Sequence, residues 1–590
     1  RLFERGVKLN VMAMVDSTSL DVDTLVHGIE LSQVGLTAED LTALKDLFEH
    51  ATTFGSLINV PQELAVQLPK LKLLCEYTSQ DLFVSETLKL LSLLLKQAEL
   101  LAMKFDSVVA NPPYMGRKKA MNLQVKAYTD RNFTESKGDL FACFIERSYR
   151  LTKDIGKSAM VTMQSWMSLS SYKKMRERLL RERTIMTLTQ IGFNSFPSMN
   201  SKVAKAVVFS LTNSMIKNYL GSYIDLNRAP QAADKSSVFL SKDRTIRFDV
   251  SSENFKKISG SPLAFWISPK VFNIFDESKN ADKLASSRAG MATGDNDIFT
   301  RQWFEVEYQF IKLDSVSLDD ALLSSAKWFP YNKGGAYRKW YGNISLTIAY
   351  DSNSRAKLQT MGNNCASEDC YFKEAVTWTD LTTGRLAARF LPHGAIFDIA
   401  GPCAYPVLDG GHIIALAMLN TNFANDLSGM INSTMHFQPG DFRKLPIPRL
   451  ISKESIDKIV WSCINFSKKD WDAYERSWDF QSLPIISASS EANYTLENSY
   501  NSWINQNLEM ISELKFLEEE NNRLFNDAYE LQNELSPEVP IEQITITVNP
   551  AYRYGVKGLE EDRNTRFRED TMEELVSYAI GCMMGRYSLD

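Results

Sequence analysis

The pattern of apolar and polar residues predicts an α/β fold for the first 215 residues. Apolar residues recur at helical spacing from Ala38 to Glu49 and from Ser85 to Met103. Residues 1–104 as a whole read as strand fragments combined with helices. Further along we expect strands at 105–110, 159–162, 186–191 and 203–211, with helices at 139–150 and 172–183. This alternation is typical of a mostly parallel sheet covered by helices.

The pattern changes near residue 215. Ser, Asn and Asp become frequent, and short aromatic-rich strands alternate with glycine-rich turns until about residue 410, which favours a mixed or β-rich region. From about residue 451 the chain is helical again. A heptad seam runs through Met510, Leu514, Leu517, Asn521, Leu524, Ala528 and Leu531. It predicts a helical hairpin or brace, with a short coiled-coil dimer as the alternative.

Composition limits the class of protein. A chain of 590 residues is too long for one core, so we expect several domains, and 44% hydrophobic with 23% charged residues is ordinary for a globular protein. No stretch reaches the length of a membrane span. Seven scattered cysteines without a Cys-x-x-Cys pair favour reduced thiols in the cytoplasm and no metal site. The net charge of −6 allows nucleic-acid binding only through a locally basic groove.

The most informative segment is Asn111-Pro112-Pro113-Tyr114, which follows an apolar run expected to be a buried strand. The Asn111 side-chain oxygen and the Pro112 carbonyl can accept both protons of an exocyclic amino group, which returns its lone pair to nitrogen. Two prolines make the turn stiff. Tyr114 offers a flat face to a base rotated out of a duplex. The motif is typical of enzymes that methylate such an amino nitrogen, and the alternative is a Pro-Pro turn that caps a core strand.

Two basic segments are candidate DNA contacts. Residues 327–340 interleave basic and aromatic side chains with glycines, which suits a nucleic-acid surface or, equally, a β-hairpin with inward aromatics. A second basic loop directly follows Tyr114. The candidate contacts are Arg117, Lys118, Lys119, Lys333, Arg338 and Lys339. The glycine-rich loop at 290–296 lacks the spacing and lysine of a phosphate loop.

Five segments together resemble the PglX family, the adenine-specific DNA methyltransferases of bacteriophage-exclusion (BREX) systems. They are FDSVVANPPYMGRKKAMN at 105–122, KGDLFACFIERSYRL at 137–151, AMVTMQSWMSLSS at 159–171, the Lys-Gly-Gly-containing stretch at 328–342, and SYAIGCMMGRYSLD at 577–590. The resemblance covers most of the chain. The first segment alone indicates only an amino-methyltransferase, whereas the combination is specific.

The resemblance implies N6-methylation of adenine in double-stranded host DNA, with S-adenosylmethionine as cofactor and other phage-exclusion proteins as partners. Asn111, Pro112, Pro113 and Tyr114 carry over as the catalytic turn. Tyr114 and Phe196 are the candidate stacking residues. The methionine end of the cofactor would lie against Asn111 and Pro112. We expect direct in-line methyl transfer to a flipped adenine, without a metal or a covalent enzyme intermediate.

The same resemblance gives the expected parts of the chain. They are a Rossmann-like methyltransferase domain at 1–215, a connector at 216–285, a mixed α/β target-recognition domain at 286–450 and a helical spacer or clamp at 451–590. No glycine-rich turn or ribose-binding acid precedes Asn111. We therefore expect the amino-terminal part of the domain to be missing, which leaves the rest of the cofactor pocket unassigned. Ser201-Lys202 also stands where the family pattern has Gly-Glu.

Two other functions remain open at this point. The chain could be a DNA-recognition and assembly subunit whose phage-blocking role does not need methylation, or a single-chain restriction–modification enzyme with a nuclease elsewhere. By charge complementarity, an acidic DNA-mimicking phage protein could occupy the same basic groove.

Overall fold

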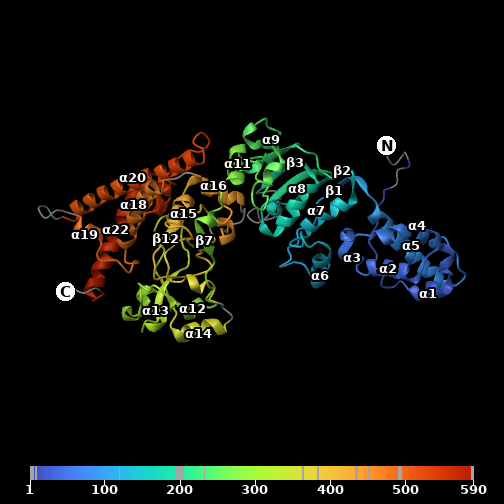
Figure 1. The fold of residues 1–590 in the computed structure, drawn as a ribbon, viewed down its shortest axis with the longest axis horizontal. Helices are drawn as coiled ribbons and strands as arrows, with labels where there is room; N and C mark the ends of the chain where they lie inside the picture. The colour runs from blue at the N-terminus through green and yellow to red at the C-terminus, as the bar shows by residue number, and fades with distance from the viewer. Residues whose placement is uncertain are drawn as a thin grey trace. The chain divides into compact units, whose positions relative to one another are not determined.

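The structure is a computed structural model and describes residue 6 and residues 9–118, 120–192, 205–230, 233–361, 365–381, 384–431, 436–449, 452–488 and 495–586. The chain forms two compact units, Arg1–Ile267 and Ser268–Asp590. Figure 1 shows their elements, and each unit is described by itself below. Among the described residues, no helix is both long enough and apolar enough to cross a membrane.

The first unit begins with a layer of helices. These are α1 (Val22–Gly28), α2 (Ala38–Phe48), α3 (Ala51–Phe54), α4 (Gln62–Cys75) and α5 (Leu82–Ala102). Their apolar faces meet in one core, which includes the fully buried Leu41, Leu44 and Phe48. The two predicted helices are confirmed. The predicted strand fragments are wrong, because the described residues of this layer form helices and loops only: their apolar residues recur at helical spacing and so share one helix-on-helix core.

A six-stranded sheet follows, in the order β1-β2-β4-β3-β5-β6. Its strands are β1 (Phe105–Ala110), β2 (Thr152–Met163), β3 (Thr184–Gly192), β4 (Ala206–Thr212), β5 (Leu220–Asp225) and β6 (Arg247–Ser251). The four predicted strands are present, but the prediction of a mostly parallel sheet is wrong. Only β1–β2 and β3–β5 pair in parallel, because β4 returns antiparallel between β2 and β3 and β6 runs antiparallel to β5. Residues 220–251, expected to be a connector, extend this sheet.

Strand β1 lies at the edge of the sheet. Its side chains are exposed or half-buried, and Val109 is 78% exposed. The prediction of a buried strand is therefore wrong. A strand is buried only where other strands lie along both of its edges and further layers cover both of its faces. Within the described chain β1 pairs along one edge only, with β2, and its side chains keep exposed surface.

The remaining helices of this unit are α6 (Leu123–Asn132), α7 (Leu140–Leu151), α8 (Lys173–Glu182), α9 (Lys235–Leu240) and α10 (Ser252–Phe255). Helix α7 packs against β1 and β2. Its buried Arg147 donates to the Ser56 carbonyl at 2.9 Å, to Asn59 Oδ1 at 3.0 Å and to the Leu101 carbonyl at 3.1 Å. This guanidinium thereby joins the helical layer to the sheet layer. Burial lowers the pKa of Arg147 to about 10.

The second unit contains two four-stranded sheets, ordered β13-β9-β10-β8 and β12-β11-β14-β7. The strands are β7 (Ala285–Arg288), β8 (Thr300–Gln302), β9 (Trp328–Asn332), β10 (Leu346–Ala349), β11 (Ala375–Trp378), β12 (Ala388–Leu391), β13 (Ile396–Phe397) and β14 (Cys403–Pro406). The helices before, among and after them are α11 (Pro269–Glu277), α12 (Asn296–Phe299), α13 (Leu318–Leu323), α14 (Ser352–Thr360), α15 (Gly411–Leu419), α16 (Asn422–Ile431) and α17 (Pro439–Phe442). The β-rich texture predicted for this region is confirmed.

The unit ends in helices α18 (Lys453–Asp472), α19 (Pro484–Ser487), α20 (Leu496–Ala528), α21 (Pro550–Tyr554) and α22 (Glu560–Met583). Helix α20 packs along α18, as Figure 1 shows in orange and red. Helix α20 covers the predicted heptad seam, but the buried seam is displaced from it. The buried positions of α20 include Trp503, Asn507, Ile511, Leu514, Glu518, Asn521 and Phe525. These buried positions repeat at the period of a straight helix, about 3.6 residues, and not at the 3.5 residues of a coiled coil. The reason is that α20 packs against several different elements.

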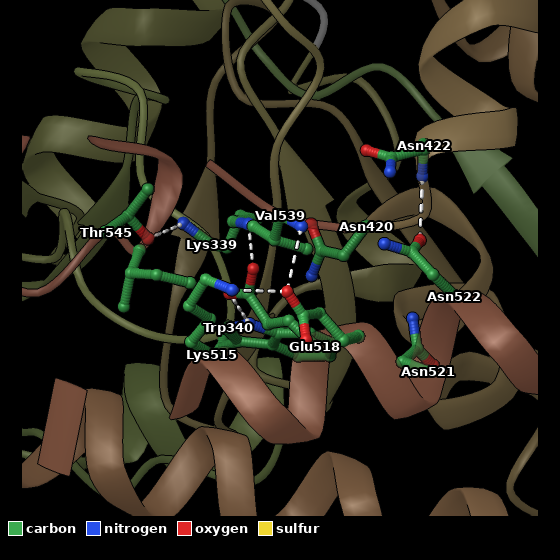
Figure 2. Close-up of polar contacts among 12 residues, drawn as sticks. Lys339, Trp340, Asn420, Asn422, Lys515, Glu518, Asn521, Asn522, Val539 and Thr545 are labelled. Atoms are coloured by element: carbon green, nitrogen blue, oxygen red, sulfur yellow. Dashed lines mark hydrogen bonds and ion pairs between the residues drawn. The ribbon is translucent and has the colours of Figure 1, made fainter. Parts of the chain in front are cut away.

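Polar side chains attach α20 to the rest of the unit (Figure 2). Asn521 Nδ2 donates to the Ala417 carbonyl at 3.0 Å, and the Asn422 N–H donates to Asn522 Oδ1 at 2.9 Å. Glu518 is buried and accepts from the Lys339 ammonium and, at 2.8 Å, from Trp340 Nε1. Such buried polar contacts fix one register of the helix, since any other register would leave these groups unpaired.

Candidate active site

The Asn-Pro-Pro-Tyr turn lies at the carboxyl end of β1. Pro112 is buried, whereas Asn111 and Pro113 are exposed. Within the described part of the chain, the Asn111 side chain makes no hydrogen bond. Its amide oxygen therefore remains available to a ligand. Asn111 and the Pro112 carbonyl together are a set of acceptors that suits the amino group of a base.

Tyr114 is held by the sheet and by α7. Its hydroxyl donates to the Val161 carbonyl at 3.4 Å, and its ring meets the Phe141 ring edge-on, with centroids 6.1 Å apart. Burial, and after it the nearby Asp139 carboxylate, raises the pKa of Tyr114. The hydroxyl thus stays protonated, and the aromatic ring stands in a defined orientation next to Asn111.

Asp139 fixes the chain that leaves the turn. Its Oδ1 accepts from the Met115 N–H at 2.8 Å and from the Phe141 N–H at 3.4 Å, so one carboxylate caps α7 and anchors the turn. The Leu140 N–H donates to the Met115 carbonyl at 3.2 Å. Burial raises the pKa of Asp139, although the hydrogen bonds that its carboxylate accepts from backbone N–H groups oppose this shift. The sequence predicted Asp139 only as the start of a helix and not as an anchor of the turn. The Gly-Asp pair before that helix was the signal that could have indicated this second role.

Gly138 provides a test of this packing. A Cβ built on Gly138 would lie 2.9 Å from the Tyr172 hydroxyl, whereas one on Gly116 would meet nothing nearer than Asp139 Oδ2 at 3.5 Å. Tyr172 is buried and packs on Phe141. We therefore expect Gly138→Ala to lower the free energy of unfolding by about 1–3 kcal/mol and Gly116→Ala to change it by less than about 0.5 kcal/mol. Thermal unfolding of the two variants measures this, and equal midpoints would contradict the packing.

The basic loop after the turn is partly neutralised. Arg117 Nη2 lies 2.7 Å from Asp130 Oδ2, and Lys137 Nζ lies 3.0 Å from Asp130 Oδ1. Hydrogen bonds from Arg117 and then from Lys137 lower the pKa of Asp130. Lys118 is exposed. The other predicted residues of this region, Lys119, Phe196 and Ser201-Lys202, lie outside the described residues.

The basic residues at 333–339, predicted to contact DNA, are mostly buried and paired. Lys333 is partly exposed, and its ammonium donates to Asn296 and lies 3.9 Å from Asp398. Arg338 and Lys339 are each 4% exposed. Arg338 Nη1 pairs with Asp470 at 3.1 Å, and Lys339 pairs with Glu518. Both cations are held in ion pairs and form no open basic surface, so the structure does not support the predicted DNA contacts of Arg338 and Lys339.

The aromatic residues of the same stretch also lie in the interior. Phe329, Tyr331 and Trp340 are buried, which agrees with the alternative of inward-facing aromatics. Strand β9 pairs antiparallel with β10, but the connection runs from 333 to 345 and is longer than a Gly-Gly hairpin turn. The segment is therefore part of the core of the second unit.

The region that contains this site is similar to known proteins. Residues 60–196, which span the turn, Asp139 and β1 to β3, match the family described as Eco57I restriction-modification methylase. The whole chain aligns with the adenine-specific methyltransferase BrxX of Escherichia coli O9:H4 (strain HS), with 33% identity over 49% of that protein. It also aligns over 84% of its length with the adenine-specific methyltransferase PglX of Lacticaseibacillus casei (strain Zhang), with 32% identity over 41% of that protein. The resemblance to the PglX family that the motifs predicted is confirmed.

The chain spans about half the length of the curated relatives it matches. Among solved structures it is similar to the type IIL restriction-modification enzyme MmeI, solved in complex with DNA. That likeness has a TM-score of 0.45 and 11% identity, and covers 89% of this chain and 76% of MmeI.

Proposed function

We propose that this chain carries the catalytic turn of a site-specific DNA adenine N6-methyltransferase that marks host DNA in a phage-exclusion system. The observation that carries the proposal is the Asn111 side chain, which is exposed at the end of β1 beside an ordered Tyr114 and makes no hydrogen bond to any described residue. The relatives named adenine-specific methyltransferases support the choice of base. Such an enzyme would act where host DNA lies, in the cytoplasm.

In the proposed mechanism the target adenine leaves the duplex and stacks on Tyr114, at a cost of a few kcal/mol of unstacking. The Asn111 oxygen and the Pro112 carbonyl accept the two N6 protons and restore nucleophilic character to the nitrogen. The stiff turn holds that nitrogen at the near-attack distance of about 3–3.5 Å from the reacting carbon. Asp139 acts only as a positioning residue, because it holds the Met115 N–H behind the turn.

S-adenosylmethionine is the proposed cofactor, and when bound it supplies the electrophilic methyl group. The residues present fit the methyl-bearing end of this cofactor, since the Asn111–Pro112 segment offers carbonyl oxygens to its positive charge and Pro112 carries no N–H. The glycine-rich and ribose-binding residues have no counterpart before Asn111.

The proposed methyltransferase function also suggests roles for the other parts of the chain. The β-rich region at 286–450 would recognise the target sequence in double-stranded DNA, and the helices at 451–590 would clamp or connect. Lys118 and Lys333 remain candidate DNA contacts, because both keep exposed surface. Other proteins of the exclusion system are the expected partners, and an acidic DNA-mimicking phage protein would compete for the same contacts.

Phage challenge of cells tests the proposal against the assembly-subunit alternative. We expect cells that carry the Asn111→Ala protein with all its partners to lose both methylation and protection. Asn111 is exposed and makes no hydrogen bond within the part of the chain that the structure describes, so the variant should accumulate and assemble like the wild type. Full protection by this variant would transfer the phage-blocking role to DNA binding and assembly.

A further inference from the structure

A cavity of about 510 Å³ lies within the second unit, and none of its lining residues belongs to the proposed methyl-transfer site. It is lined mainly by arginine and tyrosine side chains: Tyr337, Arg338, Tyr474, Arg476, Tyr552 and Arg553. A volume of this size is in the range of small-ligand sites, about 300–1,000 Å³. Nothing in the proposed function uses it.

The interior next to this cavity holds more positive than negative charge. Arg338, Arg389 and Arg476 are neighbours: Arg389 Nη1 donates to the Arg338 carbonyl at 3.3 Å, and Arg338 and Arg476 both donate to Thr547 Oγ1. Asp470 pairs with Arg338, and its oxygens also accept from the Thr547 and Val548 N–H groups at 2.7 and 3.0 Å. In the part of the chain that the structure describes, neither Arg389 nor Arg476 has a carboxylate at ion-pair distance.

Arg389 is fully buried and Arg476 is half-buried, and the Nε atom of each is buried without a hydrogen-bond partner among the described residues. Burial, and after it the charge of Arg338, lowers the pKa of Arg389 and of Arg476 to about 10 in each case. Both nevertheless stay protonated near neutral pH. A buried cation is costly unless an anion compensates it, and the cavity is the open space that Arg476 shares with Arg338 and Arg553.

The aromatic side chains that line the cavity indicate which kind of anion it would bind. Arg476 stacks at 4.4 Å on the Trp471 ring and at 5.0 Å on the Tyr474 ring, which holds its planar group in one orientation. The Tyr552 hydroxyl donates to the Tyr337 carbonyl at 2.5 Å. Glu574, at the edge of the cavity, accepts from Arg553 Nη2 at 2.9 Å. Oriented guanidinium groups beside tyrosine rings match a phosphate attached to a planar, stackable group.

We propose that this cavity binds the phosphate group of a nucleotide. Two sources share this chemistry: a backbone phosphate of DNA, which rests on the proposed function, and a free nucleotide, which does not. Arg476 is the principal ligand, and Arg553, which also pairs with Asp570 at 3.2 Å, is the second. Glu574 opposes binding because its carboxylate lies among the groups that would receive the anion.

Thermal unfolding and calorimetric titration of the 590-residue chain test the site, with sodium phosphate and deoxyadenosine monophosphate as probes and sodium chloride at equal ionic strength as the reference. We expect phosphate to raise the unfolding midpoint beyond the chloride reference. Arg476→Gln should weaken phosphate binding by about tenfold or more, since a charge-assisted hydrogen bond is lost. Glu574→Gln should tighten it by about threefold. Arg355→Gln is the matched control, because Arg355 pairs with Glu368 outside the cavity and its loss should leave phosphate affinity unchanged.

A short DNA duplex then identifies the source. Displacement of phosphate by the duplex indicates a backbone phosphate, whereas displacement by the nucleotide alone indicates a free nucleotide, and both results support the site. Equal phosphate and chloride effects would overturn it, as would unchanged phosphate affinity in Glu574→Gln. The latter variant keeps the test decisive if Arg476→Gln does not fold. A phosphate effect without methyl transfer would leave this site standing and remove the proposed function.

Discussion

Replacement of Asn111 by Ala is expected to lower the single-turnover rate of methyl transfer by about 10²- to 10³-fold, the usual loss when one preorganised hydrogen-bonding group leaves an active site. The alanine cannot accept an amino proton, so the lone pair of the target nitrogen stays delocalised. Because Asn111 is exposed and makes no hydrogen bond within the described chain, the midpoint of thermal unfolding should not change. Rates with labelled S-adenosylmethionine and the intact protein measure the first effect.

Asn122→Ala is the matched control. The Asn122 side chain accepts the Val125 N–H at 2.9 Å and caps α6, so its loss should cost about 1 kcal/mol of stability. Asn122 lies outside the Asn-Pro-Pro-Tyr turn, and the methylation rate should be close to that of the wild type. The two variants thus separate catalysis from folding. An Asn111→Ala protein that methylates at the wild-type rate would exclude the proposed role of this side chain.

Replacement of Lys339 by Met is expected to destabilise the second unit by about 3–5 kcal/mol, because it leaves the Glu518 carboxylate buried without its counter-charge. Lys339→Met with Glu518→Gln should recover most of this loss, since the amide still accepts from Trp340 Nε1 and carries no charge (Figure 2). Denaturant unfolding of the two single variants and the double variant gives the coupling energy. A loss below about 1 kcal/mol in Lys339→Met would show that the pair is not buried in solution.

The same variant has a defined pH dependence. Burial raises the pKa of Glu518, while Lys339 lowers it. Without Lys339 the folded state should bind a proton more readily than the unfolded state at pH values above the ordinary Glu pKa. Its stability should therefore rise as the pH falls through the raised pKa of Glu518. The deficit of Lys339→Met should be smaller at pH 5 than at pH 8.

Local patterns predicted the place of the Asn-Pro-Pro-Tyr turn but not the environment of its strand. Two prolines end a strand wherever they stand, so the place of Asn111 follows from adjacent residues. The exposure of Val109 depends instead on which strands pair with β1, and that is a property of the sheet. The antiparallel return of β4 is likewise set by packing between β2 and β3.

The basic residues of the second unit show a further limit of local reasoning. Arg338 and Lys339 stand among aromatic residues and glycines, which suits both a DNA surface and a core. The acids that decide between them, Asp470 and Glu518, are 132 and 179 residues away in sequence. Net charge and composition cannot place such partners. The buried positive charge next to Arg476 was equally invisible, because it arises only when Arg338, Arg389 and Arg476 meet in the fold.

The most direct test of the central claim is the identity of the methylated nucleoside. Unmodified host DNA is incubated with the intact protein, its partner proteins and labelled S-adenosylmethionine, then digested and analysed by mass spectrometry. The account predicts label in N6-methyladenine, at one recurring sequence, and none with Asn111→Ala. Label in a methylated cytosine or in protein, or DNA binding without any transfer, would contradict it.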